Sequence, residues 1–325
     1  MYGRPEQPAD PLGVSLRQRE VRAPSYRSAL SPVLSQGWPR WTPPPRPATV
    51  SQGRTVSDRT SIEWTEATWN PVTGCSKVSP GCAHCYAEAL SLRFGRSRLA
   101  WTPANSRENV KLHADRLEQP SKWRGARLVF VNSMSDLFHE EIPIEFLDRT
   151  IAAMERATQH TYQVLTKRPE RALRLLASGM VRPLPDNVWI GVSIESSRFN
   201  WRADVLRQIP ARVRFISAEP LLGSLLQEGS SRSRLNLAGI DWVIVGGESG
   251  HHARAMKAEW AREVRDACQS AGVPFFFKQW GGRTAKAGGR VLDGTVYDGI
   301  PPGVVPTRRT ASSFPAGRYR SSDQP

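Results

Sequence analysis

Short apolar runs alternate with longer amphipathic runs from residue 56 to about residue 282, and this alternation constrains the fold more than any other feature. Six runs rich in β-branched and aromatic residues are typical of strands, and a weaker candidate at 62–64 precedes them. The six cover residues 128–131, 162–165, 188–192, 213–216, 242–245 and 274–277. Several are apolar on both faces, which favours parallel strands covered by helices.

Amphipathic helices are predicted between these strands. One apolar stripe is formed by Ile144, Leu147, Ile151 and Met154. A second stripe runs from residue 260 to residue 271, where Gly272 and Pro274 end the helix, and Cys268 on that stripe is expected to be a buried core thiol. Repeated strand–helix units predict an α/β protein with a parallel sheet, in the form of a full or partial (βα) barrel.

The chain has 325 residues, of which 39% are hydrophobic, enough for a substantial core. Its 45 Lys and Arg residues against 30 Asp and Glu residues give a net charge of +15. No apolar run is long enough for a membrane span and no secretion signal is recognisable at the start, so we expect a cytoplasmic protein without a membrane partner. Four cysteines do not form a disulfide framework.

Two terminal segments lack the strand–helix pattern. Residues 1–55 contain eight Arg residues against three acidic residues, together with ten Pro residues, and we expect a disordered tail there. Regular patterning begins at Val56, and because valine codons can serve as start codons, one hypothesis is that translation begins near that position. Residues 283–325 are expected to be a flexible C-terminal tail, which leaves 56–282 as the barrel domain.

Polar or glycine residues follow each predicted strand. The carboxyl ends of barrel strands converge on one face, where active sites lie, so we expect these side chains to line a common cleft. The charged or polar candidates are Ser135, Asp136, Lys167, Arg168, Glu195, Glu219, Glu248 and Lys278. Lys167, Glu248 and Lys278 are the predicted catalytic groups among them.

Three of the four cysteines, Cys75, Cys82 and Cys85, fall within eleven positions. Their loop precedes the 128–131 strand, so we expect it to leave the first barrel strand at the same face as the charged residues. Three thiolates can hold a [4Fe–4S] cluster with one iron open to a small molecule, and this is the favoured interpretation. A zinc site remains an alternative, with a fourth ligand from His84, His113, His139 or water, and three unrelated thiols are the third possibility.

Several sequence blocks carry a resemblance to a known family. The blocks cover residues 60–75, 82–87, 133–139, 165–169, 217–222, 246–250 and 277–282, and include Thr-Gly-Cys, Cys-Ala-His-Cys-Tyr-Ala, Leu-Thr-Lys-Arg-Pro and Gly-Gly-Glu-Ser-Gly. Together they resemble an uncharacterised phage and prophage family of three-Cys-motif proteins with a radical S-adenosylmethionine-like fold. The resemblance spans about residues 57–282, in the same order.

The resemblance implies a radical-SAM-type barrel and a mechanism. Cys75, Cys82 and Cys85 would hold the cluster, whose open iron would chelate S-adenosylmethionine and cleave it reductively to a 5′-deoxyadenosyl radical. The two intervals between the cysteines are six and two residues, whereas the wider superfamily has three and two. The segment 133–136 stands where that superfamily has its glycine-glycine-glutamate segment.

The resemblance also implies ligand roles at the cleft. Asp136, with Ser135 beside it, would take the methionine amino group, and His84 would lie against the adenine. From their positions at the strand ends alone, and not from the resemblance, we expect Lys167 or Arg168 to pair with a carboxylate or phosphate, and Glu195 and Glu219 to accept ribose hydroxyls. We therefore expect an iron–sulfur enzyme that needs an electron donor and acts on a substrate that is unknown, with nucleic acid or a nucleotide preferred. The alternative is a zinc-binding, nucleic-acid-associated phage protein without radical chemistry.

Overall fold

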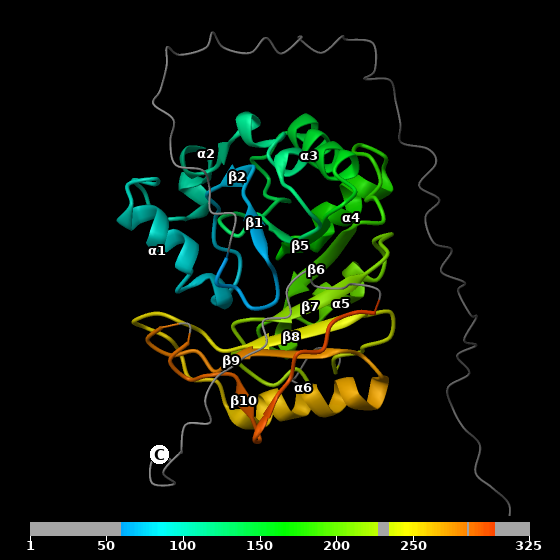
Figure 1. Ribbon diagram of the computed structural model, residues 1–325. Helices are drawn as coiled ribbons and strands as arrows, with labels where there is room; N and C mark the ends of the chain where they lie inside the picture. Colours follow the sequence, from blue (N-terminus) through cyan, green and yellow to red (C-terminus); the bar gives the residue numbers. More distant parts are fainter. Residues whose placement is uncertain (1–59, 227–233, 285, 303–325) are drawn as a thin grey trace, which may run out of the picture. The chain divides into compact units, whose positions relative to one another are not determined.

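The structure is a computed structural model that describes residues 60–226, 234–284 and 286–302 (Figure 1). These residues belong to a compact unit that spans Thr55–Pro325. The predicted tail at 1–55, the hypothesis of a start near Val56 and the last part of the predicted C-terminal tail lie outside the described residues. Within the described ranges, no helix is both long enough and apolar enough to cross a membrane.

The central element is one parallel sheet of seven strands, which curls into a half-barrel (Figure 1). Its order is β1-β4-β5-β6-β7-β8-β9, so strands that follow one another along the sheet also follow one another along the chain. The strands are β1 (Ala67–Trp69), β4 (Leu128–Val131), β5 (Thr161–Thr166), β6 (Val188–Ser193), β7 (Arg214–Ala218), β8 (Trp242–Gly246) and β9 (Phe275–Gln279). The prediction of an α/β parallel barrel is confirmed in its partial form.

Helices connect the strands, as the apolar spacing predicts. The α-helices are α1 (Tyr86–Arg93), α2 (Ser106–Asn109), α3 (Ile144–Arg156), α4 (Pro169–Ala177), α5 (Trp201–Leu206) and α6 (Ala258–Ala271). Two-strand sheets pair β2 (Val72–Thr73) with β3 (Lys111–Leu112) and β10 (Val291–Leu292) with β11 (Thr295–Val296). Helix α6 ends at Gly272 with φ +65°, and Cys268 is fully buried, so both of these predictions are confirmed.

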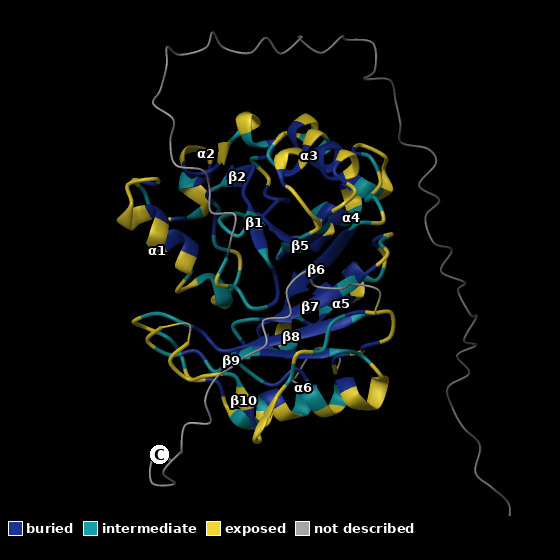
Figure 2. Cartoon of the chain, in the orientation of Figure 1, coloured by how far each residue is buried: buried dark blue, intermediate teal, exposed yellow. Residues whose placement is uncertain are grey.

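The two faces of the sheet carry different apolar clusters, because successive side chains of a strand point to opposite faces. The larger cluster joins one face to the helices and includes Val131, Val164, Ile190, Val245 and Phe277. A second cluster fills the concave face and is called here the inner cluster. It consists of Trp64, Phe130, Trp189, Val213, Phe215, Trp242, Ile244 and Phe276. Figure 2 shows most of the sheet in the colour of buried residues.

The same two-residue period places polar groups beyond the inner cluster, toward the carboxyl ends of the strands. Ser193, Ser217 and Lys278 follow Trp189, Phe215 and Phe276 by an even number of residues within their strands. They therefore share the concave face with the inner cluster. The aromatic side chains of the inner cluster thus fill the interior of the half-barrel, and polar side chains line its carboxyl edge.

The first strand begins later than predicted. The candidate at 62–64 is wrong, and β1 instead pairs with β4 through Ala67 and Val129. Trp64 does not belong to a strand; its ring packs in the inner cluster, 4.7 Å from the ring of Phe130. An aromatic residue that plugs the half-barrel produces the same local apolar signal as a strand.

The predicted domain end at residue 282 is also wrong. The β10–β11 hairpin follows that residue and buries Leu292 completely. The indole nitrogen of Trp242 donates to the Gly299 carbonyl at 2.7 Å, and the Phe277 amide donates to the Tyr297 carbonyl at 3.0 Å. The segment 286–302 is therefore part of the fold rather than of a flexible tail.

Candidate functional site

The three clustered cysteines lie in the connection between β2 and α1, which we call the cysteine loop (residues 74–85). The loop starts against the segment that follows β4: the Gly74 amide donates to the Met134 carbonyl at 2.9 Å, and the Ser135 hydroxyl donates to the Gly74 carbonyl at 2.7 Å. Gly74 has φ +86°, and a Cβ there would meet the Asn109 carbonyl oxygen at 1.8 Å. Only glycine fits this point, from which the loop passes to the carboxyl edge of the sheet.

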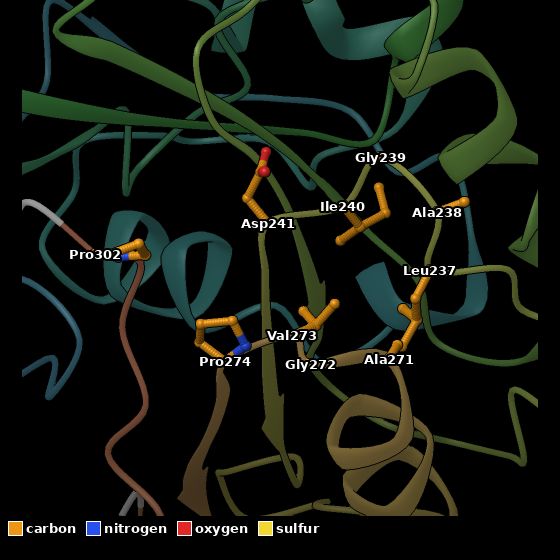
Figure 3. Close-up of a pocket in the computed structure, with 10 residues that line it drawn as sticks. All are labelled: Leu237, Ala238, Gly239, Ile240, Asp241, Ala271, Gly272, Val273, Pro274 and Pro302. Atoms are coloured by element: carbon orange, nitrogen blue, oxygen red, sulfur yellow. The ribbon is translucent and has the colours of Figure 1, made fainter.

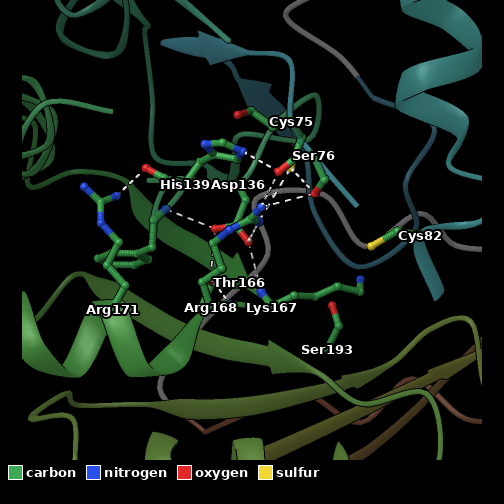
Figure 4. Close-up of polar contacts among 12 residues, drawn as sticks. Cys75, Ser76, Cys82, Asp136, His139, Thr166, Lys167, Arg168, Arg171 and Ser193 are labelled. Atoms are coloured by element: carbon green, nitrogen blue, oxygen red, sulfur yellow. Dashed lines mark hydrogen bonds and ion pairs between the residues drawn. The ribbon is translucent and has the colours of Figure 1, made fainter. Parts of the chain in front are cut away.

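Arg168, directly before α4, is the main contact between the sheet and Cys75 (Figure 4). Its guanidinium lies 3.6 Å from the Cys75 sulfur and donates to the carbonyl and hydroxyl oxygens of Ser76, each at 3.1 Å. It also donates to Asp136 at 3.1 Å and to Glu140 at 2.9 Å. All three nitrogens of this buried guanidinium are therefore engaged: the two terminal nitrogens contact the cysteine loop, and Nε donates to Glu140.

Asp136 is buried and accepts four hydrogen bonds, two on each carboxylate oxygen. The donors are the Phe138 amide, the Thr166 hydroxyl, the Lys167 amide and Arg168. Burial acts to raise the pKa of Asp136, but the charge of Arg168 and these hydrogen bonds outweigh it and lower the pKa. This carboxylate is an ionised anchor for Arg168, and its predicted role toward a bound amino group stays a prediction.

Glu195, beyond the end of β6, lies beneath the middle of the cysteine loop. It pairs with the buried Arg202 of α5 at 2.9 Å and accepts from the Ser79 hydroxyl at 2.5 Å. Its second neighbour of positive charge is Lys167, at 3.9 Å. A Cβ at Gly81 would stand 2.4 Å from the Glu195 carboxylate, so the loop backbone packs directly on this side chain.

Glu248 holds the far end of the cysteine loop from the segment after β8. It faces the His84 ring nitrogen at 3.0 Å and accepts from the Arg254 guanidinium, which also donates to the Pro80 carbonyl at 3.0 Å. Burial acts to raise the pKa of Glu248, but the hydrogen bonds from Arg254 and His84 lower it to about 2. Glu248, Arg254 and His84 form a clasp between the loop and the sheet.

The predicted residues on the last strands lie on the concave face. The Lys278 ammonium donates to the Glu219 carboxylate. Near them in the same layer, the buried hydroxyl of Ser217 has no hydrogen-bond partner among the described residues. A buried polar atom without a partner is costly, and a ligand or a water at this point would satisfy it.

The three thiols are close enough to affect one another. Burial raises the pKa of Cys75 to about 12 and also raises the pKa of Cys85, and the charge of Cys82 acts in the same direction on both. Arg168 lowers the pKa of Cys75, and Lys167 lowers that of Cys85, without overcoming burial. In the described part of the chain, no three His, Cys, Asp or Glu side chains converge on a point where a single metal ion would sit.

The histidines considered as zinc ligands have other partners. His113 faces the Thr73 hydroxyl at 2.8 Å, and His139 faces the Ser76 hydroxyl at 2.8 Å. Burial lowers the pKa of both imidazoles, which keeps them neutral at pH 7. His139 thus braces the cysteine loop through Ser76, beside Arg168.

A hollow of about 510 Å³ lies elsewhere on the sheet (Figure 3). Its lining comes from the segments that lead into β8 and β9 and from the C-terminal end of α6. Its one acidic side chain, Asp241, accepts from the Arg214 amide at 2.7 Å. The hollow therefore belongs to the amino edge of these strands, opposite the cysteine loop.

Sequence reasoning missed several residues that complete the site. They are Ser76, Ser79, Arg202 and Arg254, while His139 was considered only as a zinc ligand. Arg202 is the clearest case, because a guanidinium that is 2% exposed must have an anionic partner, yet its place on a short helix gives no periodic signal. For the clasp, the sequence did contain a signal: a basic residue, Arg254, follows Glu248 by six positions and could have been predicted as its partner.

The structure thus brings all the predicted site residues to one region, the carboxyl edge of the half-barrel and the loop over it. Comparison with curated proteins and with solved structures gave no match. A family model described as a protein of unknown function (DUF5131) matches residues 59–301, which covers most of the chain and extends past the predicted domain end at 282. The chain belongs to the DUF5131 family.

Proposed function

We propose that this protein is a radical-SAM-type enzyme that holds a [4Fe–4S] cluster through Cys75, Cys82 and Cys85 and binds S-adenosylmethionine at the carboxyl edge of the half-barrel. The observation that carries the proposal is the anchoring of the cysteine loop over that edge. Arg168, Glu195 and Glu248, from the segments after three different strands, each contact the loop. A loop fixed at three points above a partial parallel barrel is suited to present a metal group to a ligand.

The donor set fits an iron–sulfur cluster. Thiolates are the usual protein ligands of such clusters, and a set of three leaves one iron without a protein ligand. Burial raises the pKa of Cys75 to about 12, so binding of the cluster would have to displace the thiol proton, as thiolate ligation requires. Arg168 beside Cys75 and Lys167 near Cys85 would offset the negative charge of the bound cluster.

Polar side chains at the carboxyl edge of the concave face are suited to bind an adenosyl amino acid. A reduced cluster of this kind supplies the electron for reductive cleavage of S-adenosylmethionine. Lys167 and Lys278 can bind its carboxylate, and Ser217 and Glu219 can bind hydroxyl groups. Arg168 and Asp136 act as positioning residues, because their polar atoms are already engaged with the loop and with each other. The inner cluster excludes water from below the ligand.

Anaerobic reconstitution with iron and sulfide tests the cluster. We expect about four irons per chain in the wild type and a large loss of iron in Cys82→Ser. Cys268→Ser is the matched control, because Cys268 lies on the buried side of α6 and far in sequence from the loop, so it should keep the full iron content. Equal iron in both variants, or tight zinc binding without iron, would contradict the proposal and favour the zinc alternative.

Electron paramagnetic resonance tests the ligand. The spectrum of the reduced, reconstituted protein should change when S-adenosylmethionine is added, because the ligand would coordinate the open iron. Lys278→Met should weaken this response while leaving the iron content unchanged. A spectrum that stays the same at saturating S-adenosylmethionine would leave an iron–sulfur protein but remove the assigned chemistry.

A further inference from the structure

Helix α1, which begins directly after Cys85, has an inverted pattern of burial. The side chains that it buries are small or polar: Ala87, Glu88 and Ser91. Its large apolar side chains face outward, with Tyr86 48% exposed, Leu90 38% exposed and Leu92 40% exposed. Phe94, the residue after the helix, is 61% exposed. Figure 2 shows exposed residues along α1 beside the buried sheet.

Three of these exposed residues, Tyr86, Leu90 and Phe94, form one surface, which we call the α1 face, whereas Leu92 lies on a different side of the helix. Tyr86, Leu90 and Phe94 are spaced by four residues, so they lie along one side of the helix. The backbone positions of Tyr86 and Phe94 are about 12 Å apart along the axis at 1.5 Å per residue. A contiguous patch of exposed apolar residues is a candidate interaction site.

The charge of the α1 face is uniformly positive. Residues 89–107 contain four arginines and no acidic residue. Among the described residues, Arg93, Arg96 and Arg98 are exposed and have no ion-pair partner. The guanidinium groups of Arg93 and Arg96 lie 5.7 and 5.8 Å from the centre of the Phe94 ring, one on each side of it in sequence.

We propose that the α1 face binds single-stranded nucleic acid. Exposed aromatic rings stack with unpaired bases, and flanking arginines neutralise the phosphates, which together give binding with little sequence preference. In a duplex, the bases are already stacked on one another, so a duplex would leave the rings of Tyr86 and Phe94 without a base to stack on. A protein partner would need acidic groups to match the arginines and would gain nothing from the stacking geometry at Phe94.

The place of the α1 face connects it to the proposed site. Tyr86 is the neighbour of Cys85 in the chain, and its hydroxyl donates to the Ser133 carbonyl at 2.6 Å, beside Ser135. A strand bound along α1 would therefore reach the cysteine loop. The inference rests on the proposed function in one respect, since it names the substrate class of that site.

Fluorescence anisotropy with a labelled oligonucleotide of about 20 nucleotides, as single-stranded DNA and as RNA, tests the proposal. The full chain is used without added metal. Phe94→Ala should weaken binding roughly 5- to 100-fold, the loss expected for one stacked base. Arg93→Ala with Arg96→Ala should reduce the slope of log affinity against log salt by about 1.4. Circular dichroism checks that the variants stay folded.

Matched controls come from α3, from α4 and from the segment directly after α4. Arg149→Ala with Arg174→Ala removes two exposed arginines from α3 and α4, and Met180→Ala removes an apolar side chain that is 56% exposed. These changes should leave the affinity within about twofold of the wild type. The terminal arginines contribute equally to all variants, so only differences between variants are interpreted.

Two results would overturn the proposal. One is equal oligonucleotide affinity in the α1-face variants and the controls. The other is concentration-dependent self-association, seen by sedimentation and abolished by Leu90→Ala, with no effect of Phe94→Ala on oligonucleotide affinity, since that would assign the face to a second copy. Iron content of Phe94→Ala separates the two proposals: failure of nucleic-acid binding with normal iron loading leaves the cluster assignment intact.

Discussion

Single residues decide whether the cysteine loop stays over the sheet, and Arg168 has the most contacts to it. It joins the loop at Ser76 and Cys75 to the carboxylate of Asp136. Both members of this ion pair are less than 10% exposed, so neither charge has access to solvent when its partner is missing. Removal of one partner is then far more harmful than replacement of both.

Arg168→Met is expected to lower the free energy of unfolding by about 3–5 kcal/mol, because Asp136 would be left as a buried charge without compensation. Urea unfolding at pH 7 measures this change. The loss should shrink as pH falls, because protonation of Asp136 removes the uncompensated charge. The double variant with Asp136→Asn should be less destabilised than Arg168→Met alone. Arg149→Met, an exposed position on α3, is the control and should have a small effect.

Glu248 gives the clasp a defined pH dependence. Its pKa is lowered from 4.5 to about 2, so the stabilisation is present above about pH 4.5 and is lost as pH falls toward 2. The difference in melting temperature between the wild type and Glu248→Gln should be largest near neutral pH and should decrease through this window. Glu108→Gln, at an exposed carboxylate on α2, should show no such trend. A difference that grows in acid would show that the clasp does not depend on the charge of Glu248.

At the scale of elements, the sheet depends on matched side-chain volumes on its concave face. Gly191 of β6 leaves room for the Phe215 ring of β7, and a Cβ there would lie 2.5 Å from a ring carbon. The rings of Trp242 and Trp64 lie against that ring, with centroids 5.7 and 6.4 Å away, so it has little space to move away. Strand pairing and inner-cluster packing therefore depend on the same glycine.

Gly191→Ala is expected to destabilise the protein by about 1–3 kcal/mol through overpacking. Phe215→Leu in the same chain should recover part of this loss, because the smaller side chain makes room for the added methyl group. Urea unfolding of the two single variants and the double variant gives the coupling energy. Strictly additive effects would show that the alanine is accommodated by movement elsewhere in the sheet.

At the scale of the whole described unit, the segment 286–302 packs on the last strands of the sheet. This segment covers Trp242 and β9 with backbone hydrogen bonds and the buried side chain of Leu292. The same segment lies within the family match, which ends at residue 301. The fold unit is therefore longer than the alternation of strands and helices indicates.

Truncation tests this boundary. A chain that ends at residue 302 should melt cooperatively, whereas a chain that ends at residue 282 should melt at a lower temperature or fail to fold, because Trp242 would lose its acceptor and Phe277 its backbone partner. Thermal unfolding followed by near-UV circular dichroism compares the two. Equal melting temperatures would show that residues 286–302 add no stability to the sheet.

Strong local periodicity made much of the fold predictable. Strand β4 and helices α3 and α6 follow the apolar spacing closely, since each buries a regular stripe of side chains. The prediction of the first strand failed, because the three residues of β1, Ala67–Trp69, are held by pairing with β4 and have no apolar pattern of their own that would predict a strand. The same holds for the β10–β11 hairpin, whose strands have two residues each.

The sequence by itself determined the order of strands and helices, the cysteine spacing and the polar residues after each strand, because these depend on local chemistry and on the period of burial. Only the tertiary structure decided which of those residues bind one another and which of them face the concave side of the sheet. Asp136 and Arg168 use their polar atoms on each other and on the loop, while Lys278 and Ser217 face the concave side. The reason is that hydrogen-bond partners such as Arg202 and Arg254 come from distant segments, and a buried charge takes whichever partner the fold brings within reach.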